Sequence, residues 1–126
     1  MIDHISVAVR DLRIARDFYD KVLKSLNYTV LAERPHTVGF GKRYPEFWLN
    51  HRPDMGPVPG DTGVHICLRA PSKAAVQAFH AAALAAGGQS DGAPGPRQGE
   101  MTGYYGAFIK DPDGNKIEAV SFPAPA

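Results

Sequence analysis

The sequence predicts an α+β fold built from two βαβββ modules in tandem. The first sign is a segment at residues 1–9, where apolar and polar residues alternate as in a strand; a related segment returns at residues 63–69. The second sign is a constant spacing of 61 residues between matching positions of the two halves. The matching pairs are His4 with His65, Phe18 with Phe79, and Leu23 with Leu84. This spacing indicates an internal duplication, although the register slips beyond the helices.

Size and composition are those of an ordinary globular protein. The 126 residues suit a single domain with its own core, and the hydrophobic share of 44% and charged share of 21% are typical. A net charge of +1, with scattered basic residues, gives no indication of a nucleic-acid or membrane partner. A single cysteine, Cys67, and no signal-peptide or membrane-length apolar run predict a soluble, cytoplasmic protein.

In the first half, Asp11 is a candidate N-cap for an amphipathic helix that ends near Asn27. Its apolar positions at helical spacing are Ala15, Phe18, Tyr19, Val22, Leu23 and Leu26. Three short strands follow, as β-branched and aromatic residues indicate. They cover residues 28–33, 37–41 and 46–50. Module one therefore extends over about residues 1–53.

Residues 54–61 form a linker, since they contain two glycines and two prolines. Module two follows at about residues 62–122 and repeats the order of the first. Ser72 is the candidate N-cap of its alanine-rich helix, which Gly87 and Gly88 end. The expected buried stripe of this helix is Val76, Phe79, Ala83 and Leu84.

The last part of module two predicts a hairpin after a loosely structured stretch. Residues 89–103 are rich in glycine and proline, and we expect one weak strand and a mobile loop that could act as a lid. Strands are predicted at residues 104–109 and 116–122. The Asp-Pro-Asp-Gly-Asn sequence at residues 111–115 joins them with proline and glycine in the places that a tight turn requires.

Three side chains suggest a metal site. His4 and His65 lie on the non-core faces of the two related strands, and Glu118 alternates with apolar neighbours on the last strand. A carboxylate in an apolar strand is costly to bury without a partner, and a cation would supply one. Two imidazoles and one carboxylate leave coordination positions open, as a catalytic metal needs. By position, Trp48 of the first half corresponds to Glu118.

The other histidines and the cysteine have simpler explanations. A single histidine at a strand start is more often a hydrogen-bonded structural residue than a ligand, so His4 gains weight only from its match with His65. Cys67 shares a face with His65 and could line the cavity, but a buried packing role is the simpler interpretation. His80 is expected to be exposed, and no spacing argument applies to the remaining histidines. These are His36 and His51.

The sequence resembles the vicinal oxygen chelate superfamily. This superfamily includes glyoxalase I, extradiol dioxygenases, fosfomycin-resistance thiol transferases and bleomycin-resistance proteins. The resemblance rests on residues 3–9, 15–19 and 64–66, and most specifically on Phe-Ile-Lys-Asp-Pro-Asp-Gly-Asn-Lys-Ile-Glu at residues 108–118. It implies paired modules that form a cupped mixed sheet with a metal inside. It also implies a homodimer, and in many small members the site lies near the subunit interface. The positions of the superfamily's metal ligands are matched by His4, His65 and Glu118.

The sequence also departs from the patterns of individual members. Glyoxalase I has a glutamate as fourth ligand where this chain has Trp48, and Glu46 lies two residues away on the same face. Ser6 could replace a threonine that follows the first histidine in the fosfomycin enzymes. Their basic phosphonate site has no clear counterpart, since Arg97 is the one obvious cation between residues 89 and 103. Dioxygenases of this type usually have four modules.

The resemblance therefore implies a divalent-metal enzyme, of lyase, isomerase or ring-cleaving dioxygenase type, that acts on a small oxygen-chelating substrate. The metal would be Fe, Mn, Ni or Zn. Candidate pocket residues are Ser6, Trp48, Cys67, Arg97, Tyr104, Tyr105 and Phe108, with at most one of the two tyrosines pointing inward. The general base cannot be named. The alternatives are a thiol transferase, a non-catalytic binding protein, and a scaffold whose histidines are structural.

Overall fold

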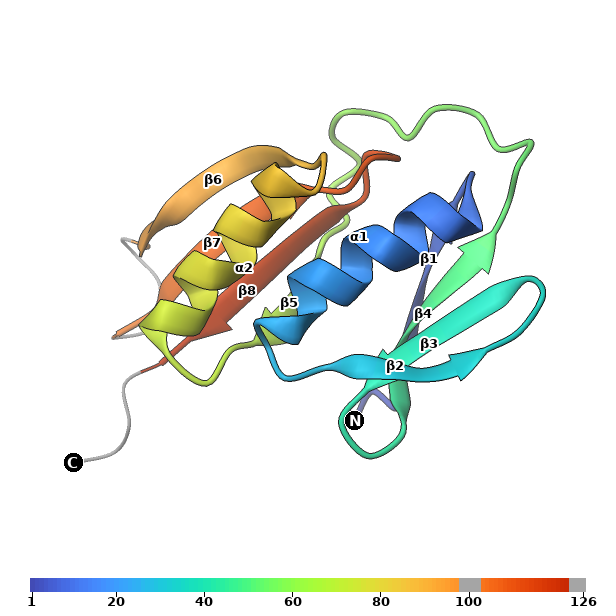
Figure 1. Cartoon of the computed structure of the whole chain (residues 1–126). Helices are drawn as coiled ribbons and strands as arrows, with labels where there is room; N and C mark the ends of the chain where they lie inside the picture. The colour runs from blue at the N-terminus through green and yellow to red at the C-terminus, as the bar shows by residue number, and fades with distance from the viewer. Residues whose placement is uncertain (98–102, 123–126) are drawn as a thin grey trace.

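The computed structural model describes residues 1–97 and 103–122, and it contains two four-stranded mixed sheets, each with one helix (Figure 1). The elements of the first module are β1 (Ile5–Val9), α1 (Leu12–Lys24), β2 (Thr29–Glu33), β3 (Thr37–Gly41) and β4 (Pro45–His51). Those of the second are β5 (Ile66–Arg69), α2 (Lys73–Ala85), β6 (Gln89–Pro96), β7 (Tyr105–Lys110) and β8 (Lys116–Ser121). The predicted tandem βαβββ fold is confirmed.

The two sheets have the same topology. Their strand orders are β1-β4-β3-β2 and β5-β8-β7-β6. In each, the first strand of the module pairs in parallel with the last, and the remaining pairs are antiparallel. The first and last strands of a module therefore lie side by side, and residues far apart in the sequence share one face. Among the described residues, no helix is both long and apolar enough to cross a membrane.

Both helices begin at the predicted caps. The Asp11 carboxylate accepts a hydrogen bond from the Ile14 backbone N–H at 2.9 Å, and the Ser72 hydroxyl accepts one from Ala75 N–H at 3.1 Å. After α1, Asn27 has a φ of 64°, in the left-handed region that ends helices. The two caps keep the 61-residue spacing, so the duplication extends to the helix starts.

The prediction that Leu84 is buried is wrong. Leu23 is fully buried, whereas Leu84 is 45% exposed. The chain after α1 continues through the buried Leu26 before its left-handed residue, but after α2 only Ala86 precedes the left-handed Gly87. The second module thus lacks a large apolar side chain beyond its helix, and the leucine at the helix end stays open to solvent.

The first strand of each module is shorter than predicted. β1 begins at Ile5 and β5 at Ile66, so His4 and His65 lie one residue before their strands. In the second module, Gly63 N–H donates to the Asp61 carboxylate at 3.0 Å and has a φ of 79°. This local turn keeps the preceding residues out of the ladder.

β6, the one strand expected in the glycine- and proline-rich stretch, is an eight-residue edge strand. Its pairing with β7 is irregular, with register shifts on both sides of Gly92. Edge strands tolerate the prolines at positions 94 and 96 because one row of backbone donors needs no partner. Of the stretch 89–103, where a loop that could act as a lid is predicted, residues 98–102 lie outside the described residues.

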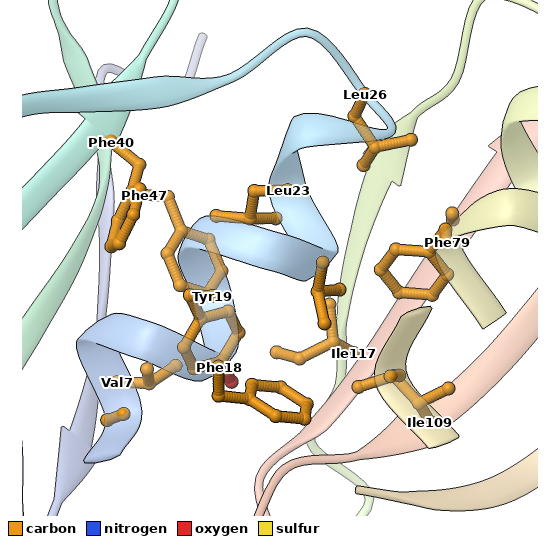
Figure 2. Packing of buried hydrophobic residues seen from close by; sticks show 14 of the residues in the cluster. Val7, Phe18, Tyr19, Leu23, Leu26, Phe40, Phe47, Phe79, Ile109 and Ile117 are labelled. Carbon is orange, nitrogen blue, oxygen red and sulfur yellow. The ribbon is translucent and has the colours of Figure 1, made fainter. Parts of the chain in front are cut away.

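One core joins the two modules. Tyr19 of α1 is fully buried, and its ring centroid lies 5.0 Å from those of Phe18 and Phe47 (Figure 2). On the side of the second module, Phe79 of α2, together with Ile109 and Ile117 of the sheet, continues the same cluster. The helices also contact each other.

The turn between β7 and β8 fastens the second module to the first. The buried Asp111 carboxylate accepts hydrogen bonds from the Tyr19 hydroxyl at 2.6 Å and from the backbone of Asp113 and Asn115 at 2.9 and 2.8 Å. The Asn115 amide donates to Asp111 and to the Ala8 carbonyl, both within 2.9 Å. The Asp-Pro-Asp-Gly-Asn segment, expected as a hairpin joint, thus also joins the two modules.

Candidate metal centre

A buried carboxylate and an imidazole meet on the outer face of the second sheet, the face that points away from the helices. Glu118 lies in the middle of β8 and is 1% exposed, while its neighbours Ile117 and Ala119 pack into the core. One oxygen of Glu118, Oε1, lies 3.1 Å from Nε2 of His65, whose side chain is 40% exposed. The pair combines two donor types that divalent metals use, with one of them open to solvent.

Tyr104 occupies the second oxygen of the carboxylate. Its hydroxyl donates to Glu118 Oε2. Burial, and then the adjacent carboxylate, raises the pKa of Tyr104, so the phenol keeps its proton and acts as a donor near neutral pH. The backbone makes room for this contact at Gly106, where a Cβ would lie 2.9 Å from Oε2. We did not identify Gly106 from the sequence, although a glycine inside an apolar strand is the available signal.

Cys67 lies beside Glu118 but is exposed, contrary to the expected buried packing role. The chain is in register here, because Cys67 of β5 pairs directly with Glu118 of β8. Desolvation of the sulfur and the neighbouring carboxylate raise the pKa of the Cys67 thiol to about 12. The thiol is therefore accessible yet protonated at neutral pH.

His4 does not join the pair within the described structure. Its Nδ1 lies 2.6 Å from the Asp3 carboxylate, and its side chain is 54% exposed. His4 and His65 nevertheless line one cavity of about 360 Å³, together with Glu46 and Cys67. Within residues 1–97 and 103–122, no cluster of three histidine, cysteine or acidic side chains is arranged to hold a metal.

The first sheet carries the equivalent position without a carboxylate. Ser6 pairs with Trp48 in the same parallel register as Cys67 with Glu118. Trp48 lies over Gly39, where a Cβ would come within 2.9 Å of the indole ring, and the Arg34 guanidinium lies 5.2 Å from the ring centroid. Ser6 is exposed on this face.

The two tyrosines point to different sides of the second sheet. Tyr104 contacts Glu118, whereas the Tyr105 hydroxyl accepts a hydrogen bond from Gln77 of α2 at 3.0 Å. Lys73 of the same helix lies 5.4 Å from the Tyr105 ring. Tyr105 therefore belongs to the helix-covered side, and Tyr104 to the outer face.

The remaining histidines form contacts of their own. His36 and His51 stack with ring centroids 6.2 Å apart. His80, expected to be exposed, is half-buried, and its Nε2 lies 2.8 Å from the Ser90 hydroxyl.

Comparison with known proteins identifies the family. Over residues 1–119 the chain matches the model of the Glyoxalase/Bleomycin resistance protein/Dioxygenase superfamily. The chain belongs to this superfamily. It is similar to a crystal structure of a glyoxalase/bleomycin resistance protein from Albidiferax ferrireducens T118, with 32% identity, a TM-score of 0.82, and coverage of 94% of this chain and 97% of that one. No curated protein matches it.

More distant members of the superfamily share the fold. A putative glyoxalase from Bacillus halodurans is 21% identical, with a TM-score of 0.72 and coverage of 96% of this chain and 95% of that one. A V278E-glyoxalase I mutant from Zea mays is 20% identical, with a TM-score of 0.73 over 94% of this chain and 44% of that one. At these identities the likeness concerns the fold alone.

Proposed function

We propose that this superfamily member is an enzyme that depends on a divalent metal ion held by His65, Glu118 and His4. The observation that carries the proposal is the His65–Glu118 pair, because a carboxylate that is 1% exposed faces an imidazole on an otherwise open sheet face. Superfamily members often use divalent metals, and nitrogen and carboxylate donors fit Fe, Mn, Ni or Zn.

The side chains around the pair define what the site could do with a small substrate that presents two adjacent oxygens. A bound divalent ion would supply Lewis-acid stabilisation of negative charge on those oxygens. Tyr104 holds the Glu118 carboxylate in place through its hydroxyl. Phe108, whose ring centroid lies 5.5 Å from that of His65, forms an apolar wall beside it.

We propose further that the protein is a homodimer and that the third ligand is His4 of the partner subunit. Two features support this assembly. Among the described residues, His4 binds Asp3 and does not complete a three-ligand group with the pair, and the outer faces of both sheets leave side chains such as Ser6 and Cys67 exposed. A dimer that brings the outer faces together would cover them. A single reduced cysteine suits the cytoplasm.

Metal analysis of protein purified without chelator tests the proposal. Wild-type protein should bind about one ion per chain, and the variants His65→Ala, Glu118→Gln and His4→Ala should weaken binding by at least tenfold, since each removes a ligand. His36→Ala is the matched control and should bind like wild type. Absence of stoichiometric metal in metal-replete protein would contradict the proposal.

Mixing two defective variants tests whether the site is shared. In a dimer that mixes His4→Ala and Glu118→Gln chains, one of the two sites keeps all three ligands if His4 comes from the partner subunit. We therefore expect mixed dimers to regain one bound ion. No recovery in verified mixed dimers would place all ligands in one chain.

A non-catalytic binding protein is the second candidate, favoured by the aromatic side chains Trp48 and Phe108 on the outer faces, both of which lie beside cations. It predicts ligand affinity that survives chelation and Glu118→Gln. The metal-dependent enzyme predicts that both treatments abolish activity.

A further inference from the structure

Arg97 places a guanidinium against Phe108, the ring that also packs against His65. The residue follows the last residue of β6, and its backbone N–H donates to the Tyr104 carbonyl at 3.3 Å. The guanidinium carbon lies 5.0 Å from the Phe108 ring centroid, and the same ring packs against His65. One aromatic side chain thus separates the cation from the candidate metal ligand.

Two glycines of the sheet contact this guanidinium, one by leaving space for it and one through its carbonyl. At Gly92 of β6, a Cβ would come within 3.0 Å of Nη2 of Arg97. At Gly106 of β7, the backbone carbonyl accepts a hydrogen bond from the same nitrogen at 3.4 Å. The arginine therefore lies against the backbone in a defined place.

The guanidinium is held but its charge is not neutralised within the described part of the chain. Its two hydrogen bonds are long, 3.4 Å each, and both run from Nη2 to carbonyls, those of Ala93 and Gly106. Nε is buried and lacks a partner among residues 1–97 and 103–122, and no described carboxylate lies within ion-pair distance. A guanidinium offers five N–H donors in a planar fork.

Lys116 provides an internal contrast on the same ring. Its ammonium lies 5.4 Å from the Phe108 centroid, yet Nζ is only 2.9 Å from the Asp91 carboxylate. The positive charge of Lys116 is thus balanced by the protein, whereas Arg97 has no such partner among residues 1–97 and 103–122.

We infer that Arg97 binds an oxyanion of the substrate, a carboxylate or a phosphoryl group, while the two adjacent oxygens of that substrate face His65 and Glu118. The inference rests on the proposed function, since it assigns a substrate class to the same site. Planar, bidentate donors match carboxylate and phosphoryl oxygens, and stacking on Phe108 fixes the fork in position. The substrate is therefore an anionic oxygen chelator, and a neutral one of the same size binds more weakly.

Three hydroxamates with one chelating head test this preference by calorimetry on metal-loaded protein. Acetohydroxamate is neutral beyond its chelating oxygens, the hydroxamate of succinic acid adds a carboxylate, and phosphonoacetohydroxamate adds a phosphonate. We expect at least one anionic probe to bind on the order of tenfold more tightly than acetohydroxamate. The probe that gains shows which oxyanion the site takes.

Matched variants assign the preference to Arg97. Arg97→Gln should abolish the advantage of the anionic probe and leave acetohydroxamate affinity unchanged, while Lys116→Gln should keep the advantage. Equal affinity for all three probes, or an advantage that survives Arg97→Gln, would overturn the inference although the metal is bound.

A second measurement tests anion binding by Arg97 in protein without metal. Inorganic phosphate and acetate are titrated into metal-free protein while the Arg97 Nε–Hε resonance is followed by NMR, with Arg97→Gln used for assignment. A saturable shift with either anion supports the inference even if no metal binds. If neither anion shifts this resonance, the inference is wrong.

Discussion

The two modules share one backbone plan but have different outer faces. In both, the first strand pairs in parallel with the last, and the paired positions are Ser6 with Trp48 in one and Cys67 with Glu118 in the other. The second face therefore carries a buried carboxylate, whereas the first carries an indole that lies over Gly39. Duplication preserved the register and changed the chemistry.

This difference indicates that the two modules have different roles in the proposed site. The second module brings together two donor groups, His65 and Glu118, and the cation of Arg97 lies nearby. In the proposed site, the first module would contribute the histidine His4, while its own outer face carries the indole of Trp48. The first module has Trp48 where the second has Glu118, so it offers no carboxylate as a further ligand. A metal at this site would therefore keep open coordination positions, which favours direct contact with substrate.

The turns that connect the last two strands also differ between the modules, since that of the second contains the buried Asp111 and that of the first is exposed. The largest effect on stability is expected at these turns. Asp111→Ala removes a buried carboxylate that accepts four hydrogen bonds, and it leaves the Tyr19 hydroxyl buried without its partner. We expect a loss of about 3–5 kcal/mol in the free energy of unfolding. Arg43→Ala, in the exposed joint of the first module, should cost less than about 0.5 kcal/mol.

Urea unfolding followed by circular dichroism compares the two variants under identical conditions. If Asp111→Ala unfolds no more easily than Arg43→Ala, the turn does not fasten the second module to the first.

The next largest difference in stability is expected between the matched leucines of the two helices, Leu23 and Leu84. Leu23→Ala removes a fully buried side chain and should destabilise the fold by about 3 kcal/mol, whereas Leu84→Ala, at 45% exposure, should cost less than about 1 kcal/mol. Equal losses in thermal or urea unfolding would mean that Leu84 is covered in solution, for example by a second copy of the chain.

These leucines show how far the sequence predicts the fold. Strand and helix order and both caps follow from local patterns, because each depends on residues within one or two turns. The tandem modules follow from the 61-residue repeat. The exposure of Leu84 does not, since it depends on the residues that follow the helix. The 61-residue spacing made the two leucines look equivalent, but the residue before the left-handed position is the buried Leu26 in the first module and only Ala86 in the second.

The site was partly predictable for similar reasons. Alternation on β8 and the repeat placed Glu118 and His65 on one face, where they lie 3.1 Å apart. The contact between Tyr19 and Asp111 spans 92 residues and has no local signal. The exposure of Cys67 also escaped prediction, because whether a face is covered depends on tertiary packing.

A smaller difference is expected in the reactivity of a thiol at the matching positions 67 and 6 of β5 and β1. At pH 8, Cys67 should react with iodoacetamide more than tenfold more slowly than an ordinary exposed thiol, since its pKa of about 12 leaves little thiolate. In the double variant Cys67→Ser with Ser6→Cys, the thiol lies opposite Trp48 and should react faster. Similar rates at the two positions would show that Glu118 and its surroundings do not suppress ionisation.

The same thiol predicts the direction of a pH effect on stability. The unfolded chain loses the thiol proton near pH 9, and the folded chain retains it to about 12. The folded state therefore binds more protons across this window, and the free energy of unfolding should fall as pH rises from 9 toward 12. Cys67→Ser should lessen this fall, as urea unfolding at several pH values can show.

The most direct test of the division between the modules is anomalous diffraction from crystals of metal-loaded protein. The account predicts one metal peak per chain, contacted by His65 and Glu118 of the second module and by His4 of the partner subunit, with Trp48 making no bond to the metal. A peak bound elsewhere, or no peak in crystals grown with excess metal, would contradict it.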